Sequence, residues 1–281
     1  MHVARIPKVA FLIIVVAYAS LVTLAPPASA TPGTATVGLY TYSYDDANVA
    51  AGATITGSGS LPAAATVPAS VTIGGRLYAV TEIGEAAFAY NGLTSVTLGS
   101  SVQTIGAFAF ENMGLTAVTI PNSVISIDTA AFGRNALTSL TLGSGLQTIG
   151  TRAFEKNLLT SVALPNAVTT LGTGAFQYNE LASLSIGNQL AAVGSYAFYW
   201  NRLTSLSVPG NVRTIGDAAF NGNALTSVTF ANGLTSIGNG AFRSNSWTLS
   251  VVMEGPKPTT IGTLPFGVTA GRTTVVSYYI D

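Results

Sequence analysis

Residues 93–114 are LTSVTLGSSVQTIGAFAFENMG, and the 22 residues that follow, 115–136, are LTAVTIPNSVISIDTAAFGRNA. Both segments open with an alternating Leu-x-x-Val-x-Leu or Leu-x-x-Val-x-Ile stretch, and both carry an Ala-Phe pair near their end. Self-similarity at a short fixed period is typical of chains that stack their repeats into a solenoid. The two segments therefore predict further copies at the same spacing.

Further copies are present on both sides. An apolar residue five positions before a phenylalanine recurs at 22-residue steps, without an insertion, from Ile83 to the last phenylalanine of the series. The phenylalanines of this column are Phe88, Phe110, Phe132, Phe154, Phe176, Phe198, Phe220 and Phe242. One unit supplies about seven inward residues, in its first copy Leu93, Val96, Leu98, Val102, Ile105, Ala109 and Phe110. A unit this short cannot bury them alone, but stacked copies can share one continuous core.

The local pattern indicates mostly β-structure. The Val-Thr-Leu type segment alternates with a period of two, which predicts a strand, and successive copies should pair in parallel about 4.8 Å apart. A glycine follows most of the column's isoleucines, as at Gly84, Gly106 and Gly150 but not at Asp128, and suits a turn. The next Ala-Phe pair fits a short helical or 3₁₀ bend. The sequence thus predicts a β-rich solenoid with a parallel strand ladder, short helical or 3₁₀ turns, and a cap at each end.

An asparagine column runs in the same register. Its members are Asn91, Asn135, Asn157, Asn179, Asn201, Asn223 and Asn245. We expect a buried ladder whose amides satisfy backbone groups at each turn, and the alternative is a polar binding stripe. Met113 replaces asparagine in one unit, so that unit should be locally irregular.

The combined pattern, L-T-S-[VL]-x-[LIV]-[PG]-x-x-[VL]-x-x-I-G-x-x-A-F-x-x-N, resembles the BspA-like (Treponema-type) leucine-rich repeat of bacterial surface proteins over about Val80 to Val252. The chain departs from that pattern in two ways: the family often has cysteine at the asparagine position, and proline follows the strand only at Pro121, Pro165 and Pro209. The resemblance implies a leucine-rich repeat solenoid on the bacterial surface, linked to adhesion to host matrix, to other cells or to glycans.

The two ends of the chain differ from the repeats. Residues 1–30 begin with basic residues, continue with an apolar run over Val9 to Leu24 and end in Ala28-Ser29-Ala30, which predicts a signal peptide cleaved after Ala30; an uncleaved anchor is the alternative. We then expect an N-terminal segment with a β-hairpin cap at 31–79, the solenoid at 80–250 and a C-terminal cap at 251–281. The hairpin should turn at Gly74-Gly75. In the C-terminal cap the spacing slips to 24, at Ile261 and Phe266, and Val275 to Tyr279 should form a closing strand.

Composition restricts the chemistry. Only 8% of the chain is charged, and without the leader nine basic residues face eleven acidic ones, a net charge of −2. There is no cysteine, and the single histidine, His2, lies in the leader, so thiol or imidazole nucleophiles, zinc sites and disulfides are excluded from the mature chain. Nucleic acid is not expected as a partner, because its binding needs a basic surface. We expect no enzymatic activity, cofactor or metal, no membrane span after the leader, and a monomer.

Two weak signals for other chemistry exist. Glu111 and Glu155 share a column two units apart and could in principle form a glycosidase pair, but both are better explained as solvated loop charges. Asp45-Asp46 could touch Ca²⁺, but two adjacent acids without further ligands are a weak indication.

Variation concentrates directly after each phenylalanine, and this selects a candidate binding site. Residues 22 apart lie on adjacent units, so aromatic and basic side chains should gather on one edge. The predicted ligand-binding residues are Lys156, Tyr178, Tyr199, Trp200 and Arg202. Exposed aromatic groups are a sign of an interaction site, so we predict contact with an extracellular protein or a glycan. The alternative is that these rings merely cover neighbouring loops.

The outward strand positions form a second surface, free of charge and rich in hydroxyls. It comprises the pairs Ser95/Thr97, Ala117/Thr119, Ser139/Thr141, Ser161/Ala163, Ser183/Ser185, Ser205/Ser207 and Ser227/Thr229. A remote alternative is that it binds ice or a polysaccharide surface. The sequence therefore predicts a secreted or cell-surface binding protein, with a passive structural envelope component as the competing function.

Overall fold

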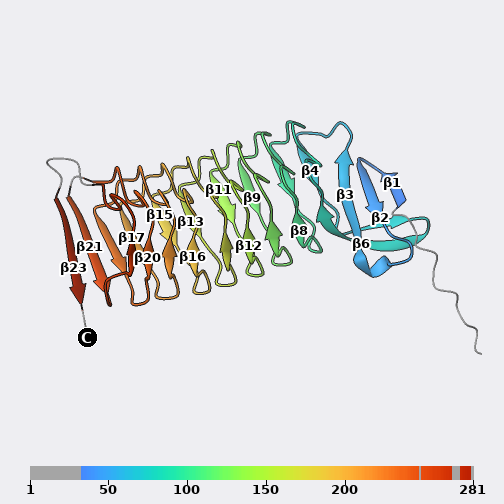
Figure 1. The fold of residues 1–281 in the computed structure, drawn as a ribbon. Helices are drawn as coiled ribbons and strands as arrows, with labels where there is room; N and C mark the ends of the chain where they lie inside the picture. Colours follow the sequence, from blue (N-terminus) through green and yellow to red (C-terminus); the bar gives the residue numbers. More distant parts are fainter. Residues whose placement is uncertain (1–32, 247, 268–272, 280–281) are drawn as a thin grey trace, which may run out of the picture.

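The computed structural model describes residues 33–246, 248–267 and 273–279, which form an elongated solenoid of about eight turns (Figure 1). The predicted leader, residues 1–30, lies outside the described residues. We call each 22-residue unit a rung. Within the described part of the chain no helix is long and apolar enough to cross a membrane.

The N-terminal end is a small, mostly antiparallel assembly. It contains β1 (Gly33–Val37), β2 (Tyr40–Tyr44), a 3₁₀ helix η1 (Val49–Ala51), β3 (Ala53–Ser58), β5 (Ser70–Ile73) and β6 (Arg76–Ile83). The predicted hairpin is present: β5 and β6 pair antiparallel around Gly74 and Gly75, whose φ angles of 58° and 81° suit a two-residue turn. β6 then continues into the solenoid, where it pairs in parallel with β8.

Each rung contributes one short strand to each of two walls. The wall predicted from the Val-Thr-Leu segments contains β4 (Ala64–Thr66), β7 (Ser95–Thr97), β9 (Ala117–Thr119), β11 (Ser139–Thr141), β13 (Ser161–Ala163), β15 (Ser183–Ser185), β17 (Ser205–Val208), β19 (Ser227–Phe230), β21 (Thr248–Glu254) and β23 (Thr273–Tyr279). The strands of this wall pair in parallel, as predicted, but in four separate groups: β4 with β7, β9 with β11, β13 with β15, and β17 to β23 in succession.

The second wall was not predicted, because its strands are only two residues long and show no alternation. They are β8 (Thr104–Ile105), β10 (Ser126–Ile127), β12 (Thr148–Ile149), β14 (Thr170–Leu171), β16 (Ala192–Val193), β18 (Thr214–Ile215), β20 (Ser236–Ile237) and β22 (Thr260–Ile261). After the predicted 24-residue step, Ile261 of β22 pairs with Ile237 of β20.

The expected helical or 3₁₀ bend takes the form of consecutive turns. In one rung the N–H groups of Ala153 and Glu155 donate to the carbonyls of Gly150 and Arg152, at 3.3 and 3.0 Å. Arg152 and Lys156 have φ angles of 55° and 52°, in the left-handed region. A right-handed helix cannot continue through such residues.

Gly150 is required for close packing between rungs. A Cβ atom there would lie 2.6 Å from the carbonyl carbon of Asp128 in the preceding rung. Its own φ is not positive, so the turn does not depend on glycine's conformational freedom.

The wall of longer strands carries a two-rung alternation. Pro121 and Pro165 end strands that pair with the following rung, where Gly143 and Gly187 lie directly against the proline carbonyls. Val96, expected to face inward, is only half-buried, whereas Val118 is buried. β7 pairs with β4 and not with β9, and Val96 and Val118 line the gap between these two strand pairs.

A stack of phenylalanine rings forms the centre of the core. All eight phenylalanines of the column are fully buried, and successive rings are stacked with centroids 4.9 to 5.7 Å apart. Tyr40 closes the stack edge-on against Phe88 at 5.7 Å, and Phe266 extends it beyond Phe242 at 5.5 Å. The stack therefore runs unbroken from the N-terminal cap to the last rung.

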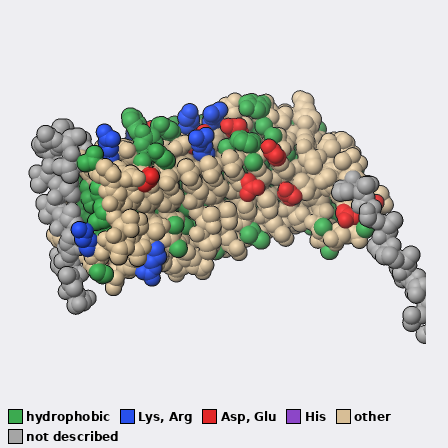
Figure 2. Space-filling model, in the orientation of Figure 1, with side chains coloured by type: hydrophobic (Ala, Val, Ile, Leu, Met, Phe, Trp, Pro, Cys, Tyr) green, Lys and Arg blue, Asp and Glu red, His purple; other side chains and the backbone are tan. Residues whose placement is uncertain are grey.

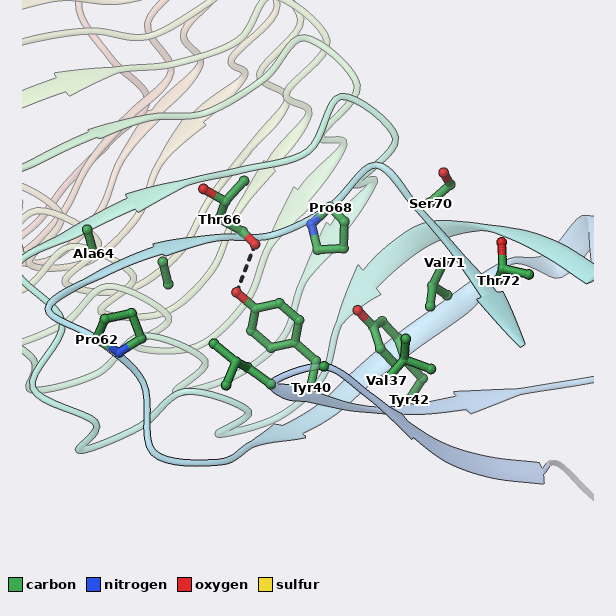
Figure 3. A pocket seen from close by; sticks show the side chains of 13 residues that line it. Val37, Tyr40, Tyr42, Pro62, Ala64, Thr66, Pro68, Ser70, Val71 and Thr72 are labelled. Carbon is green, nitrogen blue, oxygen red and sulfur yellow. Dashed lines mark hydrogen bonds between the residues drawn. The ribbon is translucent and has the colours of Figure 1, made fainter. Parts of the chain in front are cut away.

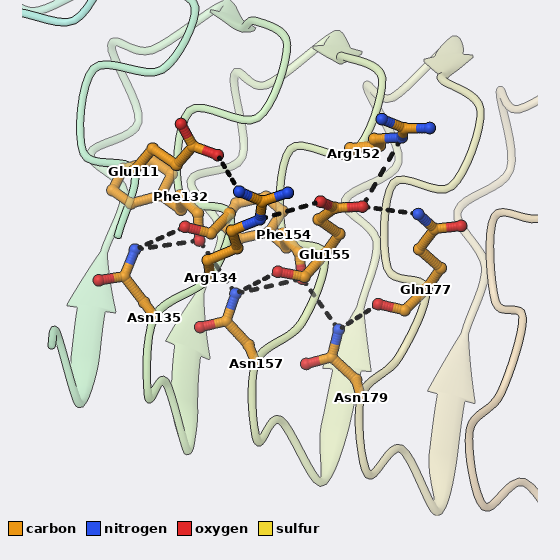
Figure 4. Close-up of polar contacts among 11 residues, drawn as sticks. Glu111, Phe132, Arg134, Asn135, Arg152, Phe154, Glu155, Asn157, Gln177 and Asn179 are labelled. Atoms are coloured by element: carbon orange, nitrogen blue, oxygen red, sulfur yellow. Dashed lines mark hydrogen bonds and ion pairs between the residues drawn. The ribbon is translucent and has the colours of Figure 1, made fainter. Parts of the chain in front are cut away.

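The asparagine amides form a second ladder beside the rings. In Asn179, Oδ1 accepts the N–H of Leu159 (3.2 Å), and Nδ2 donates to the carbonyls of Phe154 (2.9 Å) and Phe176 (3.2 Å). Figure 4 shows three successive members in the same orientation. The members buried most deeply are Asn157, Asn179, Asn201, Asn223 and Asn245, and Asn135 is half-buried.

The rung that carries Met113 is irregular, as predicted. This rung lacks the column's asparagine, and Asn135 of the next rung makes additional hydrogen bonds to its backbone. Its Oδ1 accepts three backbone N–H groups, those of Met113, Gly114 and Leu115, at 3.0 to 3.2 Å. Gly114 adopts a φ of 126°, a conformation that a side chain would strain.

Phe154→Ala should lower the free energy of unfolding by roughly 3–5 kcal/mol, because it removes a fully buried ring from between two others. Chemical denaturation would measure this cost. Ser161→Ala, on the exposed face of β13, is the control and should change it by less than about 0.5 kcal/mol. Equal stability of Phe154→Ala and the wild type would contradict the stacked core.

Asn179→Ala should lower the free energy of unfolding by roughly 1–3 kcal/mol, because it leaves the buried N–H of Leu159 without its partner and removes one of the two asparagine amides that donate to each of the Phe154 and Phe176 carbonyls. The control is Asn91→Ala in the same column. Asn91 is half-buried, and its amide donates to Ser58 Oγ and the Phe88 carbonyl, so this variant should lose clearly less. Equal losses in a denaturation series would show that burial of the amide is not what matters.

Candidate functional site

The candidate site lies on the turn edge of the solenoid, where two residues in each rung adopt left-handed backbone conformations. One column lies two residues before the phenylalanine and includes Arg152, Gly174 and Tyr196; the other lies two residues after it and includes Lys156, Tyr178 and Trp200. Their φ angles fall between 52° and 62°. Left-handed backbone costs a residue with a side chain about 1–2 kcal/mol relative to glycine, so the large side chains at these positions are held with strain.

Four aromatic side chains meet on this edge. Tyr178 contacts Tyr199 edge-on at 5.4 Å and Trp200 at 6.4 Å, and Tyr196 contacts Tyr199 edge-on at 5.6 Å. Tyr178, Tyr196 and Trp200 remain 42%, 43% and 58% exposed. The Lys156 ammonium lies 6.0 Å from the centre of the Tyr178 ring. We call Lys156, Tyr178, Tyr196, Tyr199 and Trp200 the edge cluster.

An open hollow of about 490 Å³ lies beside the rings. It is lined by Arg134, Arg152, Glu155, Lys156, Thr173, Gln177, Tyr178, Tyr196 and Tyr199. Figure 2 shows hydrophobic and basic side chains next to each other along one long edge of the molecule, with acidic side chains beside them on the same face. Aromatic rings therefore form one side of the hollow, and basic groups form the other.

A buried carboxylate organises the basic side (Figure 4). Glu155 is 5% exposed, accepts a hydrogen bond from Nε2 of Gln177 at 2.6 Å, and forms ion pairs with Arg134 and Arg152 at 3.7 Å. Arg134 also pairs with Glu111 at 3.8 Å. The interpretation of Glu111 and Glu155 as solvated loop charges is wrong, because Glu155 is buried, Glu111 is half-buried, and the Arg134 guanidinium forms ion pairs with both carboxylates.

A glycine in the middle rung lets a glutamine side chain line the hollow. Gly174 stands in the left-handed column between Arg152 and Tyr196, one rung from each, and the Gln177 amide lies over it. A Cβ at position 174 would come within 2.7 Å of that amide. The Gln177 amide therefore lies where a side chain at position 174 would be, and it lines the hollow together with Arg152 and Tyr196.

The structure brings together four of the five predicted residues. Lys156, Tyr178, Tyr199 and Trp200 lie in contact as described, but Arg202 points to a different partner, since its Nε pairs with the Glu180 carboxylate of the preceding rung. Among the described residues Arg202 makes no contact with an aromatic ring that would place it in the cluster. Sequence reasoning missed Tyr196 and Arg152, which the column two residues before each phenylalanine could have revealed.

The Tyr178 phenol is neutral at physiological pH. Partial burial raises the pKa of Tyr178, and the neighbouring Tyr199 and Glu155 raise it further. Its hydroxyl therefore remains a hydrogen-bond donor at the mouth of the hollow.

A second hollow, of about 500 Å³, lies in the N-terminal cap between β2 and the segment from Pro62 to Thr72 (Figure 3). Its lining is mainly apolar. The Tyr40 hydroxyl donates to the Thr66 carbonyl at 2.8 Å across it, and burial raises the pKa of Tyr42 to about 12. These contacts hold the cap against the first rung and offer no charged group to a ligand.

The acidic pair near the N-terminus has a structural role. Asp45 accepts the Ala47 N–H at 2.8 Å, and Asp46 accepts the Tyr78 hydroxyl and pairs with Arg76 at 3.7 Å. Within the described residues no group of three or more His, Cys, Asp or Glu side chains gathers in a way that could hold a metal ion.

A profile described as the BspA type leucine rich repeat region matches residues 81–201 and 191–267, in six copies. The chain belongs to this leucine-rich repeat family. The family predicted from the repeat pattern is thereby confirmed. No curated protein matches the sequence.

Two solved structures share the family's fold with the chain. A leucine-rich repeat protein from Bacteroides ovatus is 22% identical with a TM-score of 0.64, over 88% of this chain and 71% of that one. A leucine rich cell surface protein from Faecalibacterium prausnitzii is 22% identical with a TM-score of 0.56, over 89% of this chain and 78% of that one. At this identity the similarity shows the fold alone.

The left-handed backbone predicts an unusual order of stability for variants of Trp200. Trp200→Ala keeps the φ of 53° on a residue with a Cβ and loses the ring contacts, whereas Trp200→Gly loses the same contacts but relieves the backbone. Trp200→Gly should therefore be more stable than Trp200→Ala by about 1 kcal/mol and stay within about 1 kcal/mol of the wild type. Chemical denaturation of the three proteins tests this order, and the reverse order would contradict it.

Proposed function

We propose that the protein is a non-enzymatic leucine-rich repeat protein that binds an extracellular protein or glycan through the edge cluster. One observation carries the proposal: three large aromatic side chains, Tyr178, Tyr196 and Trp200, are 42–58% exposed and each contacts the ring of Tyr199, beside an open hollow. Tyrosine and tryptophan dominate the energetics of binding surfaces, because they offer a large rigid contact area together with a polar group.

The cost of the backbone supports a role for these side chains beyond stability. Tyr178, Tyr196 and Trp200 occupy left-handed positions, where the same columns elsewhere accept glycine, as at Gly174 and Gly222. The indole of Trp200 even lies over Gly222, where a Cβ would come within 2.7 Å of its Cδ1. Folding alone would be served better by glycine, whereas a binding surface needs the rings.

We propose that this binding takes place outside the cell, with the protein released as a monomer after cleavage of the leader behind Ala30. The leader's basic, apolar and small-residue regions support export. The comparison with a protein described as a cell surface protein is consistent with that setting. N-terminal sequencing of the protein collected from the medium or cell surface, with Thr31 as the expected first residue, tests the cleavage.

The double variant Tyr178→Gly/Trp200→Gly should bind extracellular ligands at least about tenfold more weakly than the wild type, since it removes two exposed rings without straining the backbone. Immobilised matrix proteins and glycans, titrated with the mature protein, provide the measurement. The matched control is Tyr90→Gly, because Tyr90 occupies the same left-handed column (φ 61°) and is 71% exposed but lies four rungs from Tyr178 and five from Trp200.

Two outcomes would contradict the proposal. Saturable binding that the double variant retains would place the ligand on another surface. No saturable binding by the wild type would favour a passive structural component of the envelope.

A further inference from the structure

We propose that the hollow beside the edge cluster binds an acidic oligosaccharide, with a sugar ring against the tyrosines and its carboxylate or sulfate groups against Arg134, Arg152 and Lys156. The inference rests on the proposed function and names the class of ligand for that site. It follows from the charge of the lining, from its hydrogen-bonding groups and from the state of the backbone around it.

The basic side of the hollow has unused binding capacity. The ion pairs of Arg134 and Arg152 with Glu155 are long, at 3.7 Å, and both arginine side chains remain more than half exposed. Among the hydrogen bonds of the described residues, none uses a guanidinium N–H of either arginine. A guanidinium group presents five donors in a planar fork that matches a carboxylate or a sulfate.

The balance of charge around the hollow favours an anion. Three of the nine basic residues that follow the leader line it, namely Arg134, Arg152 and Lys156, whereas Glu155 and the nearby Glu111 are the acidic side chains that face them. Gln177 holds the Glu155 carboxylate at the base of the hollow, where this carboxylate forms ion pairs with both arginines. The site is thus locally positive on a chain whose overall charge after the leader is −2.

The other side of the hollow suits a sugar ring. Tyr178, Tyr196 and Tyr199 present ring surfaces and hydroxyls together, and Thr173 and Gln177 add a hydroxyl and an amide. A pyranose has an apolar C–H face and a polar rim of hydroxyls, and so matches rings bordered by donors and acceptors. The volume of about 490 Å³ falls within the range of roughly 300–1,000 Å³ that is usual for small-ligand sites.

The backbone around the hollow argues against an acidic peptide. Extended peptides are commonly recognised by strand addition, which needs free backbone groups. Here the N–H groups of Arg152, Lys156 and Tyr178 donate to the carbonyls of the next rung, at 2.8 to 3.0 Å. Gly174 and Tyr196 donate in the same way, at 2.9 Å. A ligand must therefore be recognised by side chains, as a sugar can be.

The experiment is a binding titration with acidic oligosaccharides and their uncharged counterparts. The probes are tetramers of galacturonic and mannuronic acid with their carboxyl-reduced forms, and tetramers of chondroitin sulfate and heparin with their desulfated forms. Poly-glutamate and a single-stranded thymidine oligomer serve as non-sugar anions. The carboxylated and sulfated arms distinguish the two sources of negative charge.

At least one acidic tetramer should bind, its uncharged counterpart should bind at least tenfold more weakly, and raising the salt concentration should weaken the binding. Arg134→Gln/Arg152→Gln should weaken it at least tenfold, while Arg243→Gln, an exposed arginine on the same edge outside the hollow, should not. The arginine variant leaves Glu155 buried without its ion pairs. Lys156→Gln provides a second test that keeps these ion pairs, because the Lys156 side chain is exposed.

The inference is overturned if no acidic tetramer binds, if the uncharged forms bind equally well, or if poly-glutamate or the thymidine oligomer competes fully. If another glycan or protein still binds and is lost in Tyr178→Gly/Trp200→Gly, the proposed function stands and the ligand class is wrong. If nothing binds through the cluster, both proposals fail.

Discussion

The stacking of one buried ring upon the next is the constraint on which the rest of the structure depends. Centroid separations of 4.9 to 5.7 Å set the rise between rungs through eight 22-residue copies, and the rise is kept at 5.5 Å across the 24-residue step from Phe242 to Phe266. The asparagine amides keep the same register, because each reaches backbone groups of its own rung and of the preceding one. Ring packing and amide hydrogen bonding thus impose the same distance between rungs. A shift of one ladder out of register would therefore also disrupt the other.

This constraint explains the scarcity of charge. A strand in either wall has a neighbour on both sides and places identical columns next to each other, so a charged column would set like charges at the rung spacing. Uncharged Ser and Thr avoid that repulsion on the strand face. On the turn edge the repulsion between like charges is avoided in another way, because Glu111, Arg134 and Glu155 alternate in sign along the edge and form ion pairs between rungs. Charge is therefore tolerated where side chains are free to alternate.

The sequence was sufficient for the features that repeat, and insufficient for those that differ from rung to rung. The inward columns, the parallel wall and the irregular rung at Met113 follow from periodicity alone. The second wall could not be predicted, because two residues such as Thr148–Ile149 carry no pattern. Arg202 was assigned to the cluster from its sequence position, but its direction depends on Glu180, a pairing that spacing does not specify. The hollow could not be predicted from the sequence, because it depends on where neighbouring side chains point.

A solenoid built from such uniform rungs can vary its surface only by the size of the side chains it carries. On the turn edge each rung offers two left-handed positions, where glycine costs the fold nothing and a large side chain costs it strain. The sequence Arg152, Gly174, Tyr196 therefore places two large side chains one rung to either side of a glycine, with no change in the backbone path. Because these positions lie outside both ladders, a change of side chain there leaves the stacked core intact, and its cost is the local strain of the edge.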